Sequence, residues 1–254
     1  MKKLELIALE GIPLIEEGDN LVEIILTALE RNKISLSNGN VLVIAQKIVS
    51  KSEGRYASLN DIKPSQQAID LSRETDKDPK LVQLILNESK EVVRYRKGVI
   101  VVENILGLIH ANAGIDKSNI KSDSNNPRVL LLPLDPDKSA LEIRKEILKK
   151  TKKKVGIIIN DSSGRAWRNG IVGIAIGSSG AEVLSDLKGN LDLFGNTLEV
   201  TEVGKADEVA SAASLLMGQG KEALPVVVIK GLTESEDLNG AKALIRKPSE
   251  DLFR

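Results

Sequence analysis

Three short aliphatic runs most constrain the fold of this 254-residue chain, because none of them is interrupted by a charged side chain. They lie at residues 41–45, 155–159 and 225–229 and consist mainly of valine and isoleucine. A continuous aliphatic run of this length is typical of a strand that is buried on both faces of a sheet. Only 2% of the residues are aromatic, so the core around these strands must be aliphatic.

Helical patterns lie between these strands and predict a mixed α/β fold with mixed sheets and packed helices. Asn20 and Ser139 can cap helices that extend to about residues 31 and 154. Two further helices are expected within residues 64–87, divided near Pro79, and an alanine-rich one at 206–217. Additional strands are expected at residues 3–9, 92–95, 99–102, 171–176 and 198–203. Gly170, Gly173 and Gly177 mark a strand against which another backbone packs closely.

The length suits a single domain of residues 1–254, or two modest lobes within it. Residues 117–127 are polar and predict a loop, and residues 233–254 predict a peripheral C-terminal tail. Lys plus Arg and Asp plus Glu both number 36, which argues against a nucleic-acid binder. No apolar run approaches 18 residues, so we expect no membrane span and a cytoplasmic protein.

The absence of cysteine excludes disulfides, thiolate metal sites and cysteine nucleophiles. His110 is the only histidine, which excludes a histidine-rich zinc site. Because it follows an aliphatic strand, we interpret it as a structural histidine rather than a catalytic base. Trp167, the only tryptophan, is more typical of a core or an interface than of a stacking platform.

Two polar runs follow apolar segments and carry the candidate chemistry. Residues 110–119 hold Asp116 and Asn119, and residues 160–165 hold Asp161 and Ser162. If both runs are loops at strand ends, the two carboxylates can share a divalent ion. Mg²⁺ and Mn²⁺ prefer such oxygen ligands. The alternative is that both aspartates only cap helices or turns.

Basic side chains near these runs could hold phosphate. Lys47 and Lys51 follow the strand at residues 41–45, and Arg165 with Arg168 follows Asp161. Arginine offers a planar donor fork that matches a carboxylate or phosphate, although surface ion pairing is the ordinary role. The Walker pattern G-x-x-x-x-G-K-[ST] is absent, so no P-loop fold is expected.

Several motifs occur together in an order that resembles the F420-0:γ-glutamyl ligase family, over about residues 4 to 232. The motifs are Gly11-Ile-Pro-Leu, Ser50-Lys-Ser-Glu-Gly-Arg, Asn112-Ala-Gly-Ile-Asp-x-x-Asn, Asp161-Ser-x-Gly-Arg, and residues 206–210 with 217–219. The resemblance implies a GTP-dependent ligase that adds L-glutamate to the deazaflavin coenzyme precursor F420-0. It also implies a homodimer, Mg²⁺ or Mn²⁺ (two ions), and K⁺.

Particular residues receive roles through this resemblance. Asp116 and Asp161 would hold one divalent ion, and Ser162 and Gln219 a second. Some relatives carry an acid at the position of Gln219. The chemistry of amide formation, rather than the resemblance, points to Lys51 and Arg165 as catalytic residues that neutralise charge. The residues implied in guanine-nucleotide binding are Ile12, Pro13, Leu14, Ile15, Gln46, Lys47, Lys51, Asn119, Leu215, Leu216, Met217, Gly218, Gln219, Gly220, Lys221 and Glu222.

The chemistry of amide formation suits these residues. A carboxylate is a poor electrophile, so it must be activated, and an acyl phosphate made from GTP would serve. Charge neutralisation and alignment are then needed more than a protein nucleophile. The alternatives are a metal-dependent ligase or phosphotransferase that acts on another carboxylic acid, and a non-catalytic nucleotide-binding dimer.

Overall fold

The computed structural model describes residues 3–123 and 125–253. Ser124 of the predicted loop and Arg254 of the predicted tail therefore lie outside the described residues, as do Met1 and Lys2. The helices are α1 (Leu21–Arg31), α2 (Gln46–Ser52), α3 (Gln66–Thr75), α4 (Pro79–Asn87), α5 (Pro136–Thr151) and α6 (Lys205–Met217), with 3₁₀ turns at Leu59–Asp61, Asn112–Gly114, Ala241–Leu244 and Pro248–Glu250. The strands are β1 (Glu5–Ala8), β2 (Val41–Ala45), β3 (Tyr56–Ser58), β4 (Ser89–Arg96), β5 (Val99–Asn104), β6 (Ile109–Ala111), β7 (Arg128–Leu130), β8 (Gly156–Arg165), β9 (Arg168–Ser179), β10 (Ser185–Asp186), β11 (Glu202–Val203) and β12 (Val226–Lys230).

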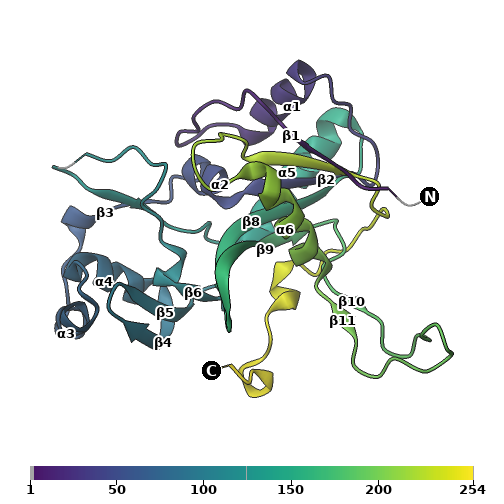
Figure 1. Ribbon diagram of the computed structural model, residues 1–254. Coiled ribbons are helices and arrows are strands. Elements are labelled where there is room, and N and C mark those ends of the chain that lie inside the picture. Colours follow the sequence, from purple (N-terminus) through teal and green to yellow (C-terminus); the bar gives the residue numbers. More distant parts are fainter. Residues whose placement is uncertain (1–2, 124, 254) are drawn as a thin grey trace.

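A central sheet in the order β1-β12-β2-β8-β9 organises the molecule (Figure 1). Only β2 and β8 pair in parallel within it, so the sheet is mixed. Leu42 and Ile44 of β2 face a core shared with α1, α2 and α5, whereas Val41 and Val43 face a core shared with α6. Because both faces are covered, every position of β2 is apolar. The prediction of buried strands and a mixed α/β fold is confirmed.

A second group of elements lies to one side of the central sheet (Figure 1). It contains α3, α4, the sheet β4-β5-β6 and the pair β3-β7. These elements enclose their own aliphatic core, which includes Val82, Ile85, Ile100 and Val102. The chain enters this group from α2 and leaves it after β7 toward α5, and Asp116 lies on the segment between β6 and β7.

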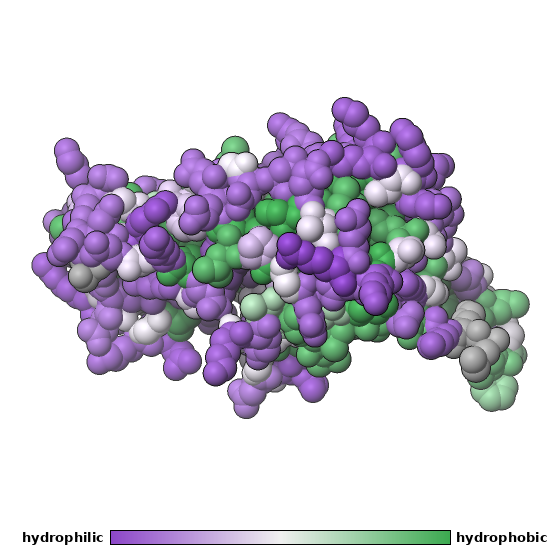
Figure 2. Space-filling model, turned by 90° about the horizontal axis from the view of Figure 1, so that it is seen from above, coloured by the Kyte–Doolittle hydropathy of each residue, from purple (hydrophilic) through white to green (hydrophobic). Residues whose placement is uncertain are grey.

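A thin arm formed around β10 and β11 projects from the other side of the central sheet (Figure 1). Its tip exposes Leu193 (99% accessible) and Phe194 (90%). Figure 2 shows apolar residues at this end of the molecule, while hydrophilic residues cover much of the remaining face. No helix within residues 3–123 and 125–253 is long and apolar enough to cross a membrane.

The strand predicted at residues 155–159 is longer than expected. β8 continues through the polar run to Arg165, because β9 pairs with it as Asp161↔Ile174 and Ser162↔Gly173. The prediction that Asp161 lies in a strand-end loop is therefore wrong. Cross-strand hydrogen bonding holds this run extended despite its poor strand propensity.

Two predicted boundaries are also wrong. Asp135, not Ser139, caps α5: its carboxylate accepts a hydrogen bond from Lys138 N at 3.0 Å, and Pro136 occupies the first turn. Acidic caps and a proline at the helix start are both favourable. The strand expected at residues 198–203 is reduced to β11, since a regular ladder with β10 forms only at Glu202–Val203.

The glycine-rich strand β9 is packed closely by helices, as predicted, at two of its three glycines. A Cβ at Gly173 would lie 2.1 Å from Ser214 Oγ of α6, and one at Gly177 would lie 2.4 Å from the Pro136 carbonyl oxygen of α5. Gly170 differs, because nothing lies within 4 Å of its Cβ position and its φ is +86°. It serves the backbone conformation of the β8–β9 hairpin instead.

Candidate functional site

Helix α2 presents two lysines to the segment that follows β6. Lys47 and Lys51 are four residues apart and therefore share one face of the helix. Lys47 Nζ lies 2.7 Å from Asp116 Oδ2 and 2.7 Å from Ser118 Oγ. Lys51 Nζ donates to the carbonyl oxygen of Asn119 at 2.6 Å. The structure thus brings together Lys47, Lys51, Asp116 and Asn119, which lie far apart in the sequence.

Tight backbone geometry places Asp116. The preceding turn has positive φ at Asn112, Ala113 and Gly114. A side chain at Gly114 would meet Leu132, since a Cβ there would lie 2.7 Å from Leu132 Cδ1. Asp116 then exchanges both backbone hydrogen bonds with Leu130 at 2.9 Å, and its Oδ1 accepts from Ser118 N at 2.6 Å. These bonds fix the carboxylate opposite α2.

Asp161 lies beside this cluster because β8 runs parallel to β2. The register pairs Ala45 with Asn160, so Asp161 follows at the level where Gln46 begins α2. Its side chain is 13% exposed, and its Oδ1 accepts from Ser162 N at 2.8 Å. The Gln46 side chain also faces this carboxylate and acts to lower its pKa. Two carboxylates therefore reach one site, Asp116 from a turn and Asp161 from a strand.

The two carboxylates differ in electrostatics. Burial, aided by the charge of Asp116, raises the pKa of Asp161 to about 7, although Ser162 N, Lys47 and Gln46 oppose the shift. Burial also acts to raise the pKa of Asp116, but hydrogen bonds from Lys47 and Ser118 and the charge of Lys47 hold that pKa below its usual value. Asp116 is thus a paired carboxylate, whereas Asp161 is a desolvated one.

Lys51, one of the two lysines on α2, is also partly desolvated. Burial and, secondarily, the charge of Lys47 lower the pKa of Lys51, and Asp116 partly offsets this. A partly dehydrated ammonium binds an anion more strongly than a fully solvated one, because less water must be removed.

The end of α6 closes the site from another side. Gln219 Oε1 accepts from Ser162 Oγ at 2.8 Å, and Asn119 Nδ2 donates to the Gly220 carbonyl oxygen at 3.2 Å. Gly218 ends the helix with φ of 68°, and Glu222 Oε2 accepts from Gly220 N at 2.7 Å. The predicted pair Ser162 and Gln219 is therefore in contact. Within the same segment Leu215 (85%) and Leu216 (37%) are exposed, Met217 (8%) is buried, and Lys221 is exposed.

The N-terminal segment predicted to bind nucleotide lies between β1 and α1. Ile12 and Ile15 turn toward the aliphatic core, Pro13 is exposed, and Leu14 is 90% exposed. Gly18 N then donates to the Ser52 carbonyl oxygen at 2.9 Å, which joins this segment to the end of α2. Nucleotide binding by residues 12–15 stays a prediction.

Arg165 lies away from the lysines and carboxylates, at the tip of the β8–β9 hairpin. Its guanidinium donates to the Asn169 carbonyl oxygen at 3.2 Å across the turn. Trp167 at the same tip is 86% exposed and is not a core residue. Its ring centroid lies 6.4 Å from that of Phe253 in the C-terminal segment. A catalytic role for Arg165 stays a prediction and would require this hairpin tip to approach the site.

His110 is buried (4% exposed), and burial lowers its pKa to about 4. Its ring is therefore neutral at physiological pH. Its Nε2 lies 3.9 Å from Asp161 Oδ2, so the ring is closer to the site than expected from the sequence. Gln46 was expected only as a nucleotide contact, through the resemblance, and neither its position beside Asp161 nor that of Ser118 beside Lys47 was expected. A serine two residues after an aspartate is too common in turns to have signalled this contact.

The donor set fits a magnesium-type ion. No group of three or more His, Cys, Asp or Glu side chains that could hold a metal occurs in the described part of the chain. Mg²⁺ needs only one or two carboxylates, with water and substrate phosphates completing the shell. Asp116 and Asp161 meet that requirement, and the Ser162 and Gln219 oxygens form a separate pair. A carboxylate left desolvated with a pKa of about 7 also favours a cationic partner.

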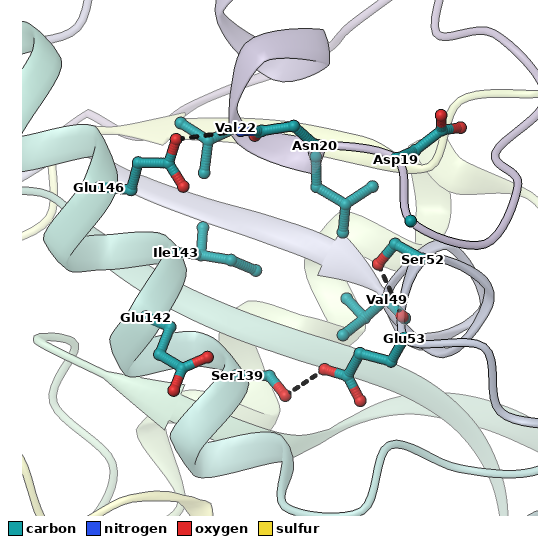
Figure 3. A pocket seen from close by; sticks show the side chains of 12 residues that line it. Asp19, Asn20, Val22, Val49, Ser52, Glu53, Ser139, Glu142, Ile143 and Glu146 are labelled. Carbon is teal, nitrogen blue, oxygen red and sulfur yellow. Dashed lines mark hydrogen bonds between the residues drawn. The ribbon is translucent and has the colours of Figure 1, made fainter.

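A separate hollow of about 310 Å³ lies between α1, α2 and α5 (Figure 3). Its wall carries Asp19, Glu53, Glu142 and Glu146, and Figure 3 shows Glu53 turned toward Ser139, with 2.5 Å between the two oxygens. None of the predicted site residues lines this hollow. Four carboxylates would repel a phosphate, so this hollow is unsuited to a nucleotide.

The fold and the site define a class: a mixed α/β protein without a P-loop, in which paired carboxylates and lysines meet at the edge of a parallel strand pair. This chain belongs to the F420-0:gamma-glutamyl ligase family, whose model matches residues 11–231. The predicted family is confirmed.

Curated relatives resemble the chain over almost its whole length. Each is named coenzyme F420:L-glutamate ligase. The protein of Methanothermobacter thermautotrophicus is 43% identical over 253 residues, which cover 99% of both chains. That of Methanocaldococcus jannaschii is 45% identical, covering 100% of this chain and 98% of the relative. That of Methanopyrus kandleri is 42% identical, covering 100% of both.

Proposed function

We propose that this protein is a GTP-dependent ligase that adds L-glutamate to coenzyme F420-0 in successive, finally γ-linked amide bonds and releases GDP and phosphate. The observation that carries the proposal is the meeting of Lys47, Lys51, Asp116 and Asp161 in a chain that the ligase family matches from residue 11 to 231. The relatives named above are, by name, ligases of coenzyme F420 and L-glutamate.

The reaction is divided into two displacements. A carboxylate oxygen of the F420-0 substrate attacks the γ-phosphorus of GTP, the bond to the bridging oxygen breaks, and GDP leaves with that electron pair. The product is an acyl phosphate. The amine of L-glutamate then attacks the acyl carbon, loses a proton to solvent, and expels inorganic phosphate. Neither displacement requires a nucleophile from the protein.

Lys51 and Lys47 would stabilise the negative charge on the phosphoryl oxygens. Lys51 suits this role because its ammonium is partly desolvated and donates to a backbone oxygen, a partner that carries no charge. Removal of one such preorganised donor typically lowers turnover by a factor of about 10² to 10³. Arg165 would join them only when the hairpin tip closes over the substrate.

Asp116 and Asp161 would hold one Mg²⁺ or Mn²⁺, and Ser162 with Gln219 a second, while K⁺ would assist nearby. Bound divalent ions neutralise phosphate charge and orient the transferring group. The guanine nucleotide would lie along α2, Asn119 and the end of α6, where residues 215–222 meet Asn119 and Ser162. We also propose that the active form is a homodimer.

Mass spectrometry with F420-0, GTP and L-glutamate tests the assignment, because each added glutamate raises the product mass by one glutamyl unit. Release of GDP and phosphate must accompany the increase and must require a divalent ion. Asp161→Asn should abolish both products, whereas Asp70→Asn, an exposed helix pair with Arg73, should leave them unchanged.

The two alternatives give different outcomes. GTP cleavage with another carboxylic acid, but without glutamyl addition to F420-0, would assign the protein as a different ligase or phosphotransferase. GTP binding without any metal-dependent phosphate release would assign a non-catalytic nucleotide-binding dimer.

A further inference from the structure

Asn104 at the end of β5 fixes the orientation of the only histidine. Asn104 is 1% exposed, and its Oδ1 accepts from both Leu106 N and Leu108 N at 3.0 Å. Because backbone N–H groups require an acceptor, the carbonyl end of this amide must face them. The amide Nδ2 therefore faces His110, and it lies 3.5 Å from His110 Nδ1.

This arrangement determines which nitrogen of His110 carries the proton. Asn104 Nδ2 can only donate, so His110 Nδ1 must accept and is unprotonated. In a neutral imidazole the proton is then on Nε2. Nε2 is buried and has no hydrogen-bond partner among the described residues. It lies 3.9 Å from Asp161 Oδ2, with both side chains shielded from solvent (4% and 13% exposed).

We propose that His110 is a positioning residue for Asp161: its Nε2–H donates to Asp161 Oδ2 when a divalent cation binds that carboxylate, and so fixes the direction of the metal-binding oxygens. The proposal rests on the proposed function, because it takes Asp161 as a metal ligand. The 3.9 Å separation is about 1 Å longer than a hydrogen bond. A turn of the aspartate about χ2, a broad and soft torsion, shortens it.

A neutral donor is well suited to this position. The groups that face Asp161 are Ser162 N, the Gln46 amide, Asp116, Lys47 and His110. Gln46 Oε1 accepts from Ser50 Oγ at 2.9 Å, so its amide nitrogen is the end left for Asp161. Ser162, Gln46 and His110 would thus supply three uncharged donors. They stabilise the carboxylate without adding positive charge that would repel the cation, and such outer partners orient metal ligands generally.

The proton position can be measured on the whole, unmodified protein. The chain has one histidine, so ¹⁵N-histidine labelling gives a single pair of ring nitrogens. Long-range ¹H–¹⁵N spectra should show a protonated Nε2 and an unprotonated Nδ1. Added Mg²⁺ should shift the Nε2–H signal, and Asp161→Asn should remove that shift. A proton on Nδ1, or no Mg²⁺-dependent change in the wild type, would overturn the proposal.

Two polar variants separate positioning from packing. His110→Gln places an amide near the Nε2 position, whereas His110→Asn reaches only the Nδ1 position. We expect Mn²⁺ affinity, measured from the EPR signal of free Mn²⁺, to fall about tenfold in His110→Asn and to be retained within about threefold in His110→Gln.

The outcomes distinguish this inference from the proposed function. Equal Mn²⁺ affinity in wild type and His110→Asn overturns the positioning role alone. An equal loss in both variants also overturns it and shows that only ring packing matters. Absence of Mn²⁺ binding in the wild type overturns the metal site itself, and the positioning role with it.

Discussion

Asp161 should destabilise the metal-free protein at neutral and higher pH. Its pKa is raised by burial to about 7, from 3.8 in an unfolded chain. The folded state therefore prefers the protonated form, and the contribution of Asp161 to stability decreases as the pH rises from about 4 through 7. One pKa unit corresponds to about 1.4 kcal/mol, so the pH-dependent loss is about 1.7 kcal/mol at pH 5 and about 4 kcal/mol at pH 8.

Asp161→Asn removes the titrating carboxyl group and nearly preserves the shape of the side chain. The variant should gain stability relative to wild type as the pH rises, by about 2 to 3 kcal/mol between pH 5 and pH 8. Urea unfolding in the presence of EDTA at the two pH values measures this difference, and Asp70→Asn is the exposed control. Added Mg²⁺ should reduce the stability difference between Asp161→Asn and wild type, because the ion stabilises the wild-type carboxylate.

If the stability of Asp161→Asn relative to wild type is the same at pH 5 and pH 8, this reasoning is refuted. That result would show that the Asp161 carboxylate is already ionised without cost in the folded protein, and that its surroundings are better solvated than its 13% exposure indicates.

Three further changes have expected outcomes. Because burial lowers the pKa of His110 from 6.5 to about 4, the contribution of His110 to the free energy of unfolding should decrease by about 3 kcal/mol as the pH falls from 6.5 to 4, opposite in sign to that of Asp161. The stability of wild type relative to His110→Gln, measured by urea titrations, should decrease by this amount over the same range. Gly173→Ala should lower the melting temperature by several degrees, since the new Cβ would lie 2.1 Å from Ser214 Oγ. Gly164→Ala is the control: no atom lies within 4 Å of its Cβ position, so the melting temperature should not change. Lys51→Met should lower kcat/KM for GTP about 100-fold in a coupled GDP assay, with the exposed Lys63→Met as an unaffected control.

The fold was predictable where one physical requirement decided the residue type. β2 and β12 are aliphatic at almost every position because both faces of the sheet are covered, so they are evident from the sequence. Asn20 caps α1 as predicted, with its Oδ1 accepting from Glu23 N at 3.1 Å. The second half of β8 was not predictable, because its polar residues are held extended by pairing with β9 rather than by their own preferences.

The site was predictable in composition but not in all its contacts. Asp116 and Asp161 were recognised as carboxylates after apolar runs, and the structure brings them to one site. The pairing of Lys47 with Asp116 was not predictable, because it depends on how the segment after β6 lies against α2. The position of His110 beside Asp161 depends in the same way on contact between β6 and β8, which are 45 or more residues apart.

The ion pair between Lys47 and Asp116 has a consequence for the order in which ligands bind. A free divalent cation meets a carboxylate whose charge is already balanced, and a free nucleotide meets an ammonium that is already engaged. Either ligand alone must therefore break this internal pair and leave one member without a counter-charge. A metal–nucleotide complex supplies a cation to Asp116 and an anion to Lys47 at the same time, so the two should bind as a unit, with each strengthening the other.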